Sequence, residues 1–187
     1  MNSNAIQLSQ YASDNSYNPG VSFFKQLIWF YAGFPLVTSY WMPFSALKIK
    51  VLRLFGASIG KGVRIKPGVR IKFPWRLTVG DDCWLGEQLW IDNLASVVIE
   101  HDVCLSQGVY LCTGNHDWSL ETFDLRLGAI KIKQSAWVGA RAVVCPGVTV
   151  GEGAVLTVNS VASKSLEPWM IHSGNPAQPV KTRVIKG

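Results

Sequence analysis

The chain has 187 residues, of which 48% are apolar and 16% are charged, a balance that suits one domain with a continuous core. Its 4 cysteines form no C-x-x-C pair and have no histidine at metal-ligand spacing, which argues against a zinc site. The start of the chain is polar and lacks the apolar core of a cleavable signal peptide. We therefore expect a cytoplasmic protein with reduced thiols and no bound metal.

The net charge of +6 is concentrated in one stretch. Residues 48–76 contain half of the 18 lysines and arginines and no aspartate or glutamate. A run of like charge is usually a solvated surface, but a basic run without acids is unusual and favours contact with anions.

The chain begins with an Asn/Ser-rich segment of about twenty residues, which predicts a mobile or loosely docked arm. Residues 26–47 then carry no charge, and this length would cover the apolar core of a bilayer. Gly33, Pro35 and Pro43 interrupt the segment, however. Three interpretations stay open: a helical hairpin packed on the base of the domain or in an oligomer contact, an interfacial membrane anchor, and a spanning helix. Residues 46–55 predict a short amphipathic helix.

The strongest signal is a period of six in residues 132–162. Neither an α-helix (period 3.6) nor a simple strand (period 2) produces it. A chain that turns a corner every six residues does, because three short strands close a triangular coil of about eighteen residues, and such coils stack at roughly 4.8 Å. The aliphatic positions are Ile132, Val138, Val144, Val150, Leu156 and Ala162, and the small or β-branched positions are Ala136, Ala142, Val148, Ala154 and Ser160.

The same rhythm runs upstream in three sets that begin twenty residues apart, so these coils carry two additional residues at one corner. We predict an all-β fold, a parallel β-helix of about five coils in residues 56–187, after an arm and apolar helical segment in residues 1–55. Gly139 and Gly151 follow an aliphatic position directly, where we expect a turn with positive φ. The upstream sets are Ile59, Ile65 and Ile71, then Val79, Leu85 and Ile91, then Ile99, Leu105 and Leu111.

The rhythm stops after Leu111 and resumes at Ile132, which predicts an extended loop near residues 113–131. This loop contains His116, flanked by Asn115 and Asp117. Imidazoles titrate near neutral pH, so His116 is a candidate general base, with a turn-stabilising role as the alternative. His101, at an outward turn, and His172, in the C-terminal segment, are expected to be structural. The chain after residue 162 leaves the repeat and is expected to cap the open end of the column.

Longer stretches of sequence identify a family resemblance. The segments TGNHDW, AWVGARAVVCPGVTVGEGAVLTVNSVASK and SGNPA resemble the hexapeptide-repeat O-acetyltransferases. The upstream text FGASIGKGVRIKPGVRIKFPWRLTVGDDCWLGEQLWIDNLASVVIE is similar to the colanic acid and exopolysaccharide biosynthesis acetyltransferase group. The resemblance implies a left-handed β-helix, exceptional among parallel crossovers, and acetyl-CoA as co-substrate.

The resemblance also implies residue roles. His116 would deprotonate the acceptor hydroxyl, and Asn93 would position the acceptor sugar, with Asn115 and Asp117 beside the base. Gln178 stands where relatives often carry an arginine for the CoA phosphate, so another cation must replace it. The residues expected to contact CoA are Trp137, Gly139 and Ala140 for pantetheine, Ser160, Ser163 and Lys164 along the arm, and Lys181 or Arg183 for phosphate.

For the quaternary structure, the resemblance implies a homotrimer with each site between two chains, His116 from one and Trp137 with residues 160–164 from the other. The expected acceptor is a sugar hydroxyl of an exopolysaccharide precursor, free or lipid-linked, and the basic block favours peripheral contact with the cytoplasmic membrane face. No nucleic-acid partner is expected. Three alternatives remain: a small soluble acceptor such as a free sugar, serine or a drug; a non-catalytic scaffold; and a hydratase resembling the γ-class carbonic anhydrases. The hydratase requires three zinc-bound histidines, and Glu121 occupies the nearest equivalent position.

Overall fold

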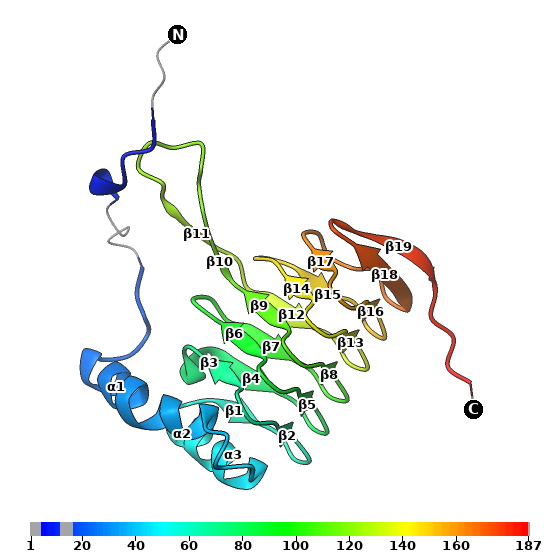
Figure 1. Cartoon of the computed structure of the whole chain (residues 1–187), viewed down its shortest axis with the longest axis horizontal. Helices are drawn as coiled ribbons and strands as arrows, with labels where there is room; N and C mark the ends of the chain where they lie inside the picture. The colour runs from blue at the N-terminus through cyan, green and yellow to red at the C-terminus, as the bar shows by residue number, and fades with distance from the viewer. Residues whose placement is uncertain (1–4, 12–16, 187) are drawn as a thin grey trace.

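A computed structural model describes residues 5–11 and 17–186 (Figure 1). Short strands stack into a three-sided column, with helices across its N-terminal end and a β-hairpin across its C-terminal end (Figure 1). A second hairpin projects from the middle of the column (Figure 1). The predicted β-helix is therefore confirmed.

Each side of the column is a sheet, which we call face A, B or C. Along faces A, B and C the coil strands pair in parallel, and the antiparallel pairs of the described chain are the two hairpins. Face A contains β1 (Ser58–Ile59), β4 (Leu77–Val79), β7 (Val97–Ile99), β12 (Ile130–Ile132) and β15 (Thr149–Val150). Face B contains β2 (Arg64–Ile65), β5 (Trp84–Leu85), β8 (Cys104–Leu105), β13 (Trp137–Val138), β16 (Val155–Leu156), β18 (Met170–Gly174) and β19 (Ala177–Thr182). Face C contains β3 (Arg70–Ile71), β6 (Trp90–Asp92), β9 (Tyr110–Cys112), β14 (Val143–Val144) and β17 (Val161–Ala162).

The strand register confirms the two coil lengths that the periodicity predicts. Ser58 pairs with Thr78, twenty residues later, whereas Lys131 pairs with Thr149, eighteen residues later. The additional residues of the first coil lie at the corner between faces C and A, where Pro74–Arg76 forms a 3-10 turn. The predicted aliphatic positions fill the interior: from Ile65 to Leu156 they are at most 2% exposed.

The glycines that follow the aliphatic positions are required for a different reason from the one predicted. Gly139 and Gly151 do not have positive φ; the left-handed residues fall two positions later, at Arg141 and Gly153. A Cβ on Gly139 would instead lie 2.7 Å from the backbone nitrogen of Val158, and one on Gly151 would lie 2.6 Å from a backbone oxygen of the next coil. These glycines are required because successive coils approach closely there.

The N-terminal segment forms α1 (Phe23–Ile28), a π-helical turn (Trp29–Gly33), α2 (Phe34–Thr38) and α3 (Ser45–Leu54). These helices close the base of the column, and their side chains form hydrogen bonds with backbone groups of its first coil. The Ser45 hydroxyl binds Ile65 O, Lys48 Nζ donates to Lys66 O at 3.2 Å, and Trp29 Nε1 donates to Lys72 O at 2.8 Å. Of the three interpretations, packing on the base is confirmed.

Trp29, Val37 and Leu52 belong to the same apolar core as the coils, so the division at residue 55 stays a prediction about chain organisation. None of the helices in the described residues has the length and hydropathy needed to cross a bilayer.

The other end of the column is closed by the β18–β19 hairpin. β18 continues face B by pairing with β16, and β19 folds back on β18. The expected C-terminal cap is thereby confirmed. His172 lies buried in β18, as expected for a structural residue. At the N-terminus, residues 5–11 include a short 3-10 turn, Leu8–Gln10, and lie against the central hairpin through a bond from Gln7 N to Glu121 O.

Candidate active site

The interruption in the hexad rhythm is an antiparallel hairpin that carries His116. Strands β10 (Gly114–His116) and β11 (Leu125–Leu127) pair with His116 opposite Leu125. The chain enters from β9 on face C and leaves to β12 on face A, so the hairpin projects from the corner between these faces (Figure 1). The predicted loop is therefore an ordered arm.

The imidazole of His116 is held in one orientation. Its Nδ1 lies 2.8 Å from the carbonyl oxygen of Phe123, and its ring stacks on the Phe123 ring at 4.4 Å with an interplanar angle of 4°. The Tyr11 ring meets it edge-on at 5.6 Å. Because a carbonyl only accepts, Nδ1 must carry the proton in this bond, and the neutral ring then has its lone pair on Nε2. This is the arrangement that a general base needs.

The neighbours of His116 support the hairpin. The Asn115 side-chain oxygen accepts from the backbone nitrogen of His116 at 2.8 Å. Asp117 is buried and accepts from Ser119 and from Arg126 across the hairpin. Hydrogen bonds from Ser119, together with the Arg126 guanidinium, hold the pKa of Asp117 below its ordinary value. Asp117, predicted beside a substrate, is thus occupied in positioning the hairpin.

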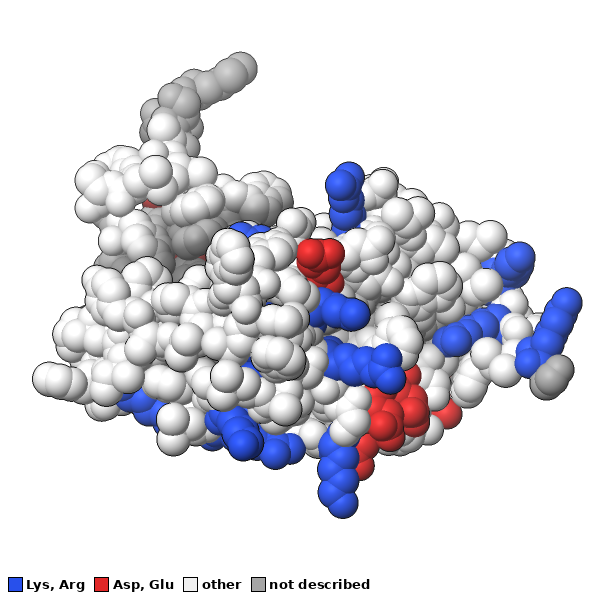
Figure 2. All heavy atoms as spheres, turned by 60° about the horizontal axis from the view of Figure 1, so that its bottom comes forward, with Lys and Arg blue, Asp and Glu red and all other residues white. Residues whose placement is uncertain are grey.

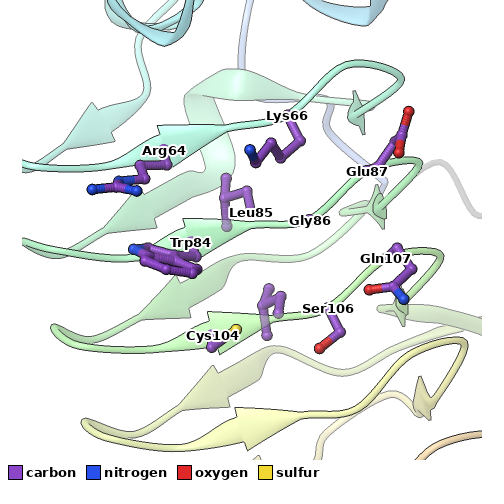
Figure 3. A pocket seen from close by; sticks show the side chains of 10 residues that line it. Arg64, Lys66, Trp84, Leu85, Gly86, Glu87, Cys104, Ser106 and Gln107 are labelled. Carbon is purple, nitrogen blue, oxygen red and sulfur yellow. The ribbon is translucent and has the colours of Figure 1, made fainter.

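Face B carries the second set of functional candidates. The Trp137 side chain is 46% exposed, and its indole nitrogen donates to the Ser106 hydroxyl at 2.9 Å. Ser106 also lines a hollow of about 390 Å³ that extends over the first three coils on the same face. Figure 3 shows this hollow between Arg64 and Lys66 above and Gln107 below.

Part of the lining is an aromatic and cationic surface that the periodicity did not reveal, and the Glu87 carboxylate also lines the hollow. The Arg64 guanidinium lies over the Trp84 ring at 4.9 Å from its centroid, and Trp84 is about half exposed. The strand register places Trp84, Cys104 and Trp137 in one row along face B. A signal was present in the sequence, because Trp84 and Trp137 both directly precede an aliphatic hexad position.

Three of the predicted contact residues are hydrogen-bonded within the chain. Asn93 is fully buried, and its amide exchanges two hydrogen bonds with the backbone of Phe73, at 2.9 and 2.7 Å. Ser160 is 1% exposed and its hydroxyl accepts from Gly174 N. The Arg183 guanidinium donates to the carbonyls of Ser135 and Gly153, beside the cap. Each of these polar side chains already has partners inside the chain, and its contact with sugar or CoA stays a prediction.

The other predicted CoA residues lie on two different sides of the column. Ser163 and Lys164 are exposed at the corner between faces C and A, the same corner from which the His116 hairpin projects. Lys181 is exposed on β19, which belongs to face B. Gly139 and Ala140 begin the corner that follows Trp137.

This distribution differs from the expected grouping of Trp137 with residues 160–164. In the triangular cross-section of the column, the corner between faces C and A lies opposite face B. One chain therefore holds His116, Ser163 and Lys164 on the side opposite its own Trp137.

The comparisons identify the family. WcaF of Escherichia coli (strain K12), named as a colanic acid biosynthesis acetyltransferase, is 36% identical over 182 residues, covering 95% of this chain and 97% of the relative. The chain belongs to this family of acetyltransferases. The corresponding WcaF of Shigella flexneri matches equally, and no family model matches.

Solved structures support the fold. The hexapeptide-repeat acetyltransferase VCA0836 from Vibrio cholerae superimposes with a TM-score of 0.73 at 20% identity, over 80% of this chain and 85% of that one. A galactoside acetyltransferase in complex with coenzyme A gives 0.75 at 21% identity, over 85% of this chain and 80% of that one. These matches confirm the left-handed β-helix that the resemblance implied. Among the described residues no group of three or more His, Cys, Asp and Glu is arranged to hold a metal ion.

Proposed function

We propose that this acetyltransferase transfers an acetyl group from acetyl-CoA to a sugar hydroxyl of an exopolysaccharide precursor, with His116 as the general base. The observation that carries the proposal is the 2.8 Å contact between His116 Nδ1 and the Phe123 carbonyl, because it fixes the tautomer and the direction of Nε2 together. The WcaF relative, named for colanic acid biosynthesis, supports the acceptor class. Structures of hexapeptide-repeat neighbours with coenzyme A and with acetyl coenzyme A support the donor.

The chemistry follows from that tautomer. The acceptor oxygen attacks the thioester carbonyl carbon while its proton passes to His116 Nε2. The tetrahedral intermediate then collapses, the carbon–sulfur bond breaks, and the imidazolium returns the proton to the CoA thiolate. No covalent acetyl-enzyme is needed, because the acceptor oxygen attacks the thioester directly while both substrates are bound.

We propose a cyclic homotrimer in which the His116 hairpin of one chain lies against face B of the next. The opposite placement of His116 and Trp137 in one column supports this arrangement, and a head-to-tail contact of this kind closes into a ring. Pantetheine would then pass Trp137, and the exposed Lys164 and Lys181 would meet the CoA phosphates near the cap.

For the acceptor, we propose the hollow on face B below Trp137. An aromatic ring such as Trp84 offers an apolar face to a sugar ring, and Arg64 and Lys66 supply positive charge beside it. Those two cations outnumber the Glu87 carboxylate of the same hollow and favour an acceptor that carries phosphate, such as a sugar on a lipid pyrophosphate, over an uncharged soluble acceptor. Such an acceptor would place the enzyme at the cytoplasmic face of the membrane.

The first experiment measures CoA release by the His116→Ala variant with a lipid-linked oligosaccharide acceptor. Turnover should fall by roughly 10²–10⁴ with folding intact, since one positioned base contributes about that much. His101→Ala is the matched control, because His101 is exposed and bonded to Asp102 and Gln134 away from the hairpin, and its turnover should stay normal. Near-normal turnover of His116→Ala refutes the assignment.

A second experiment tests whether two chains share the site. His116→Ala and Trp137→Ala chains are unfolded together, mixed in equal amounts and refolded. If the base and the tryptophan come from different chains, each mixed ring contains one site with both native residues, which is about a quarter of the sites in the whole mixture, and activity returns to about that fraction. A site within one chain would give only the average of the two variants.

A further inference from the structure

The outer surface of the N-terminal helices is unusually apolar. Trp41, between α2 and α3, is 98% exposed, and Leu54, on the last turn of α3, is 78% exposed. We call the outward side chains of this region the end surface. Its members include Phe24, Ile28, Tyr31, Trp41, Phe44, Leu47 and Leu54, all at least 45% exposed.

These side chains are not the ones that hold the helices in place. Trp29, Val37 and Leu52 point inward and are at most 2% exposed, and they pack on the first coil. The helices are therefore apolar on the inner side, which the column covers, and again on the outer side. Exposed apolar side chains that gather in one region mark a contact with a partner or a membrane.

The sequence that forms the helices and the first coil carries charge of one sign. No aspartate or glutamate occurs between Asp14 and Asp81, and this stretch contains ten lysines and arginines. Lys50 on α3 is exposed, and so is Lys61 at the first corner of the column, where the Asp81 carboxylate of the second coil accepts from the Lys61 backbone nitrogen. In Figure 2 the helical end of the molecule is a broad uncharged surface with Lys and Arg side chains along its lower edge, and the acidic side chains gather farther along the column.

From this combination we infer that the end surface docks on a membrane that contains anionic phospholipids. Exposed aromatic and aliphatic side chains bordered by cations match the boundary between acyl chains and acidic headgroups, and both contributions favour binding. A second copy of the chain fits less well, because an end-to-end contact would bring together two helical segments that carry lysine and arginine and no acid of their own.

The inference extends the proposed function without depending on its chemistry. In the proposed ring the columns stand side by side, so three end surfaces face the same direction and bind one membrane together. The hollow lined by Arg64 and Lys66 lies on the coils nearest that end, so a lipid-linked acceptor would meet the hollow and the membrane at the same end of the molecule. Vesicle binding needs no acetyl transfer, so its failure and the failure of His116 as a base are observed separately.

The experiment is cosedimentation of the full chain with vesicles of phosphatidylcholine alone or mixed with phosphatidylglycerol. The protein should bind the mixed vesicles, bind the neutral vesicles at least about tenfold more weakly, and be released by high salt. Trp41→Glu and Leu54→Glu should each weaken binding at least about tenfold, and joint Lys50→Gln and Lys61→Gln changes should remove most of the preference for phosphatidylglycerol. Val184→Glu is the matched control, since Val184 is 76% exposed on the segment after β19, and its binding should be unchanged.

Three results would overturn the inference. The first is a native chain that stays in the supernatant with both vesicle types. The second is Trp41→Glu binding as well as the native chain, which would place the contact elsewhere. The third is a lower oligomeric mass of Trp41→Glu in analytical ultracentrifugation, which would make the end surface a contact between copies. Circular dichroism of each variant checks that the helices remain folded.

Discussion

Replacing Gly139 with alanine should destabilise the column through contact between coils and not through backbone strain. The added Cβ would lie 2.7 Å from Val158 N and 2.8 Å from the carbonyl carbon of Thr157, well inside the ordinary contact range that begins at 3.4 Å. Backbone atoms of the next coil cannot rotate away, so the two coils must separate by several tenths of an ångström. Overpacking of this kind costs about 1–3 kcal/mol.

Gly147 provides the matched control, because it has the opposite properties. Its φ is +79° and an added Cβ would meet nothing within 4 Å. Gly147→Ala should therefore cost only the left-handed strain, about 1–2 kcal/mol, and Gly147→Asn should recover most of it because asparagine tolerates that conformation. Gly139→Asn should recover nothing.

Urea unfolding, followed by circular dichroism, measures both pairs. With a slope of about 2 kcal/mol per molar urea, Gly139→Ala should lower the midpoint by about 0.5–1.5 M. The reasoning is refuted if Gly139→Ala leaves the midpoint unchanged, or if Gly139→Asn is more stable than Gly139→Ala.

Three other variants address the site and the ends of the column. Arg183→Gln leaves two carbonyl groups without their donor, so it should lower the free energy of unfolding by about 1–3 kcal/mol. The KM for acetyl-CoA should stay unchanged. A raised KM with native stability would instead place Arg183 in the CoA site. Trp137→Ala should raise the KM for acetyl-CoA about 5–30-fold with a smaller effect on kcat, measured by CoA release, if the indole lines the pantetheine path. Burial lowers the pKa of Lys48 in the folded chain. Between this lowered pKa and the ordinary lysine pKa of about 10.4 the unfolded chain binds more protons than the folded chain, so the free energy of unfolding should rise with pH in that range. Urea midpoints measured across alkaline pH should show this rise in the native chain and not in Lys48→Met.

The fold was predictable because the interior of a narrow column tolerates few side chains. Each aliphatic hexad residue from Ile59 to Leu156 is buried, and the change from twenty-residue to eighteen-residue coils appears in the strand register as it does in the spacing. The reason why position 139 requires glycine was not predictable, since the backbone atoms that approach it belong to the next coil and are known only once the coils are stacked.

The candidate site was predictable only in part. The broken rhythm locates His116 on a projecting arm, but the carbonyl of Phe123 that selects its tautomer depends on how the hairpin closes. The use of Ser160 and Arg183 within the cap is equally hidden, because a hydroxyl or guanidinium in the sequence does not reveal which carbonyl or amide it will meet. Family motifs therefore indicate a region better than they indicate a contact.

The stacking of coils also determines how far the catalytic arm stands from the helical end. The His116 hairpin leaves the third coil, two steps above the coil that the helices cover, and each step is about 4.8 Å. The number of coils below the hairpin would thus set the height at which it leaves the column above a bound bilayer, roughly 10 Å above the first coil. Insertion or removal of one whole twenty-residue repeat between β3 and β7 would raise or lower it by one step, and relatives with different repeat numbers would then reach hydroxyls at different distances from the lipid.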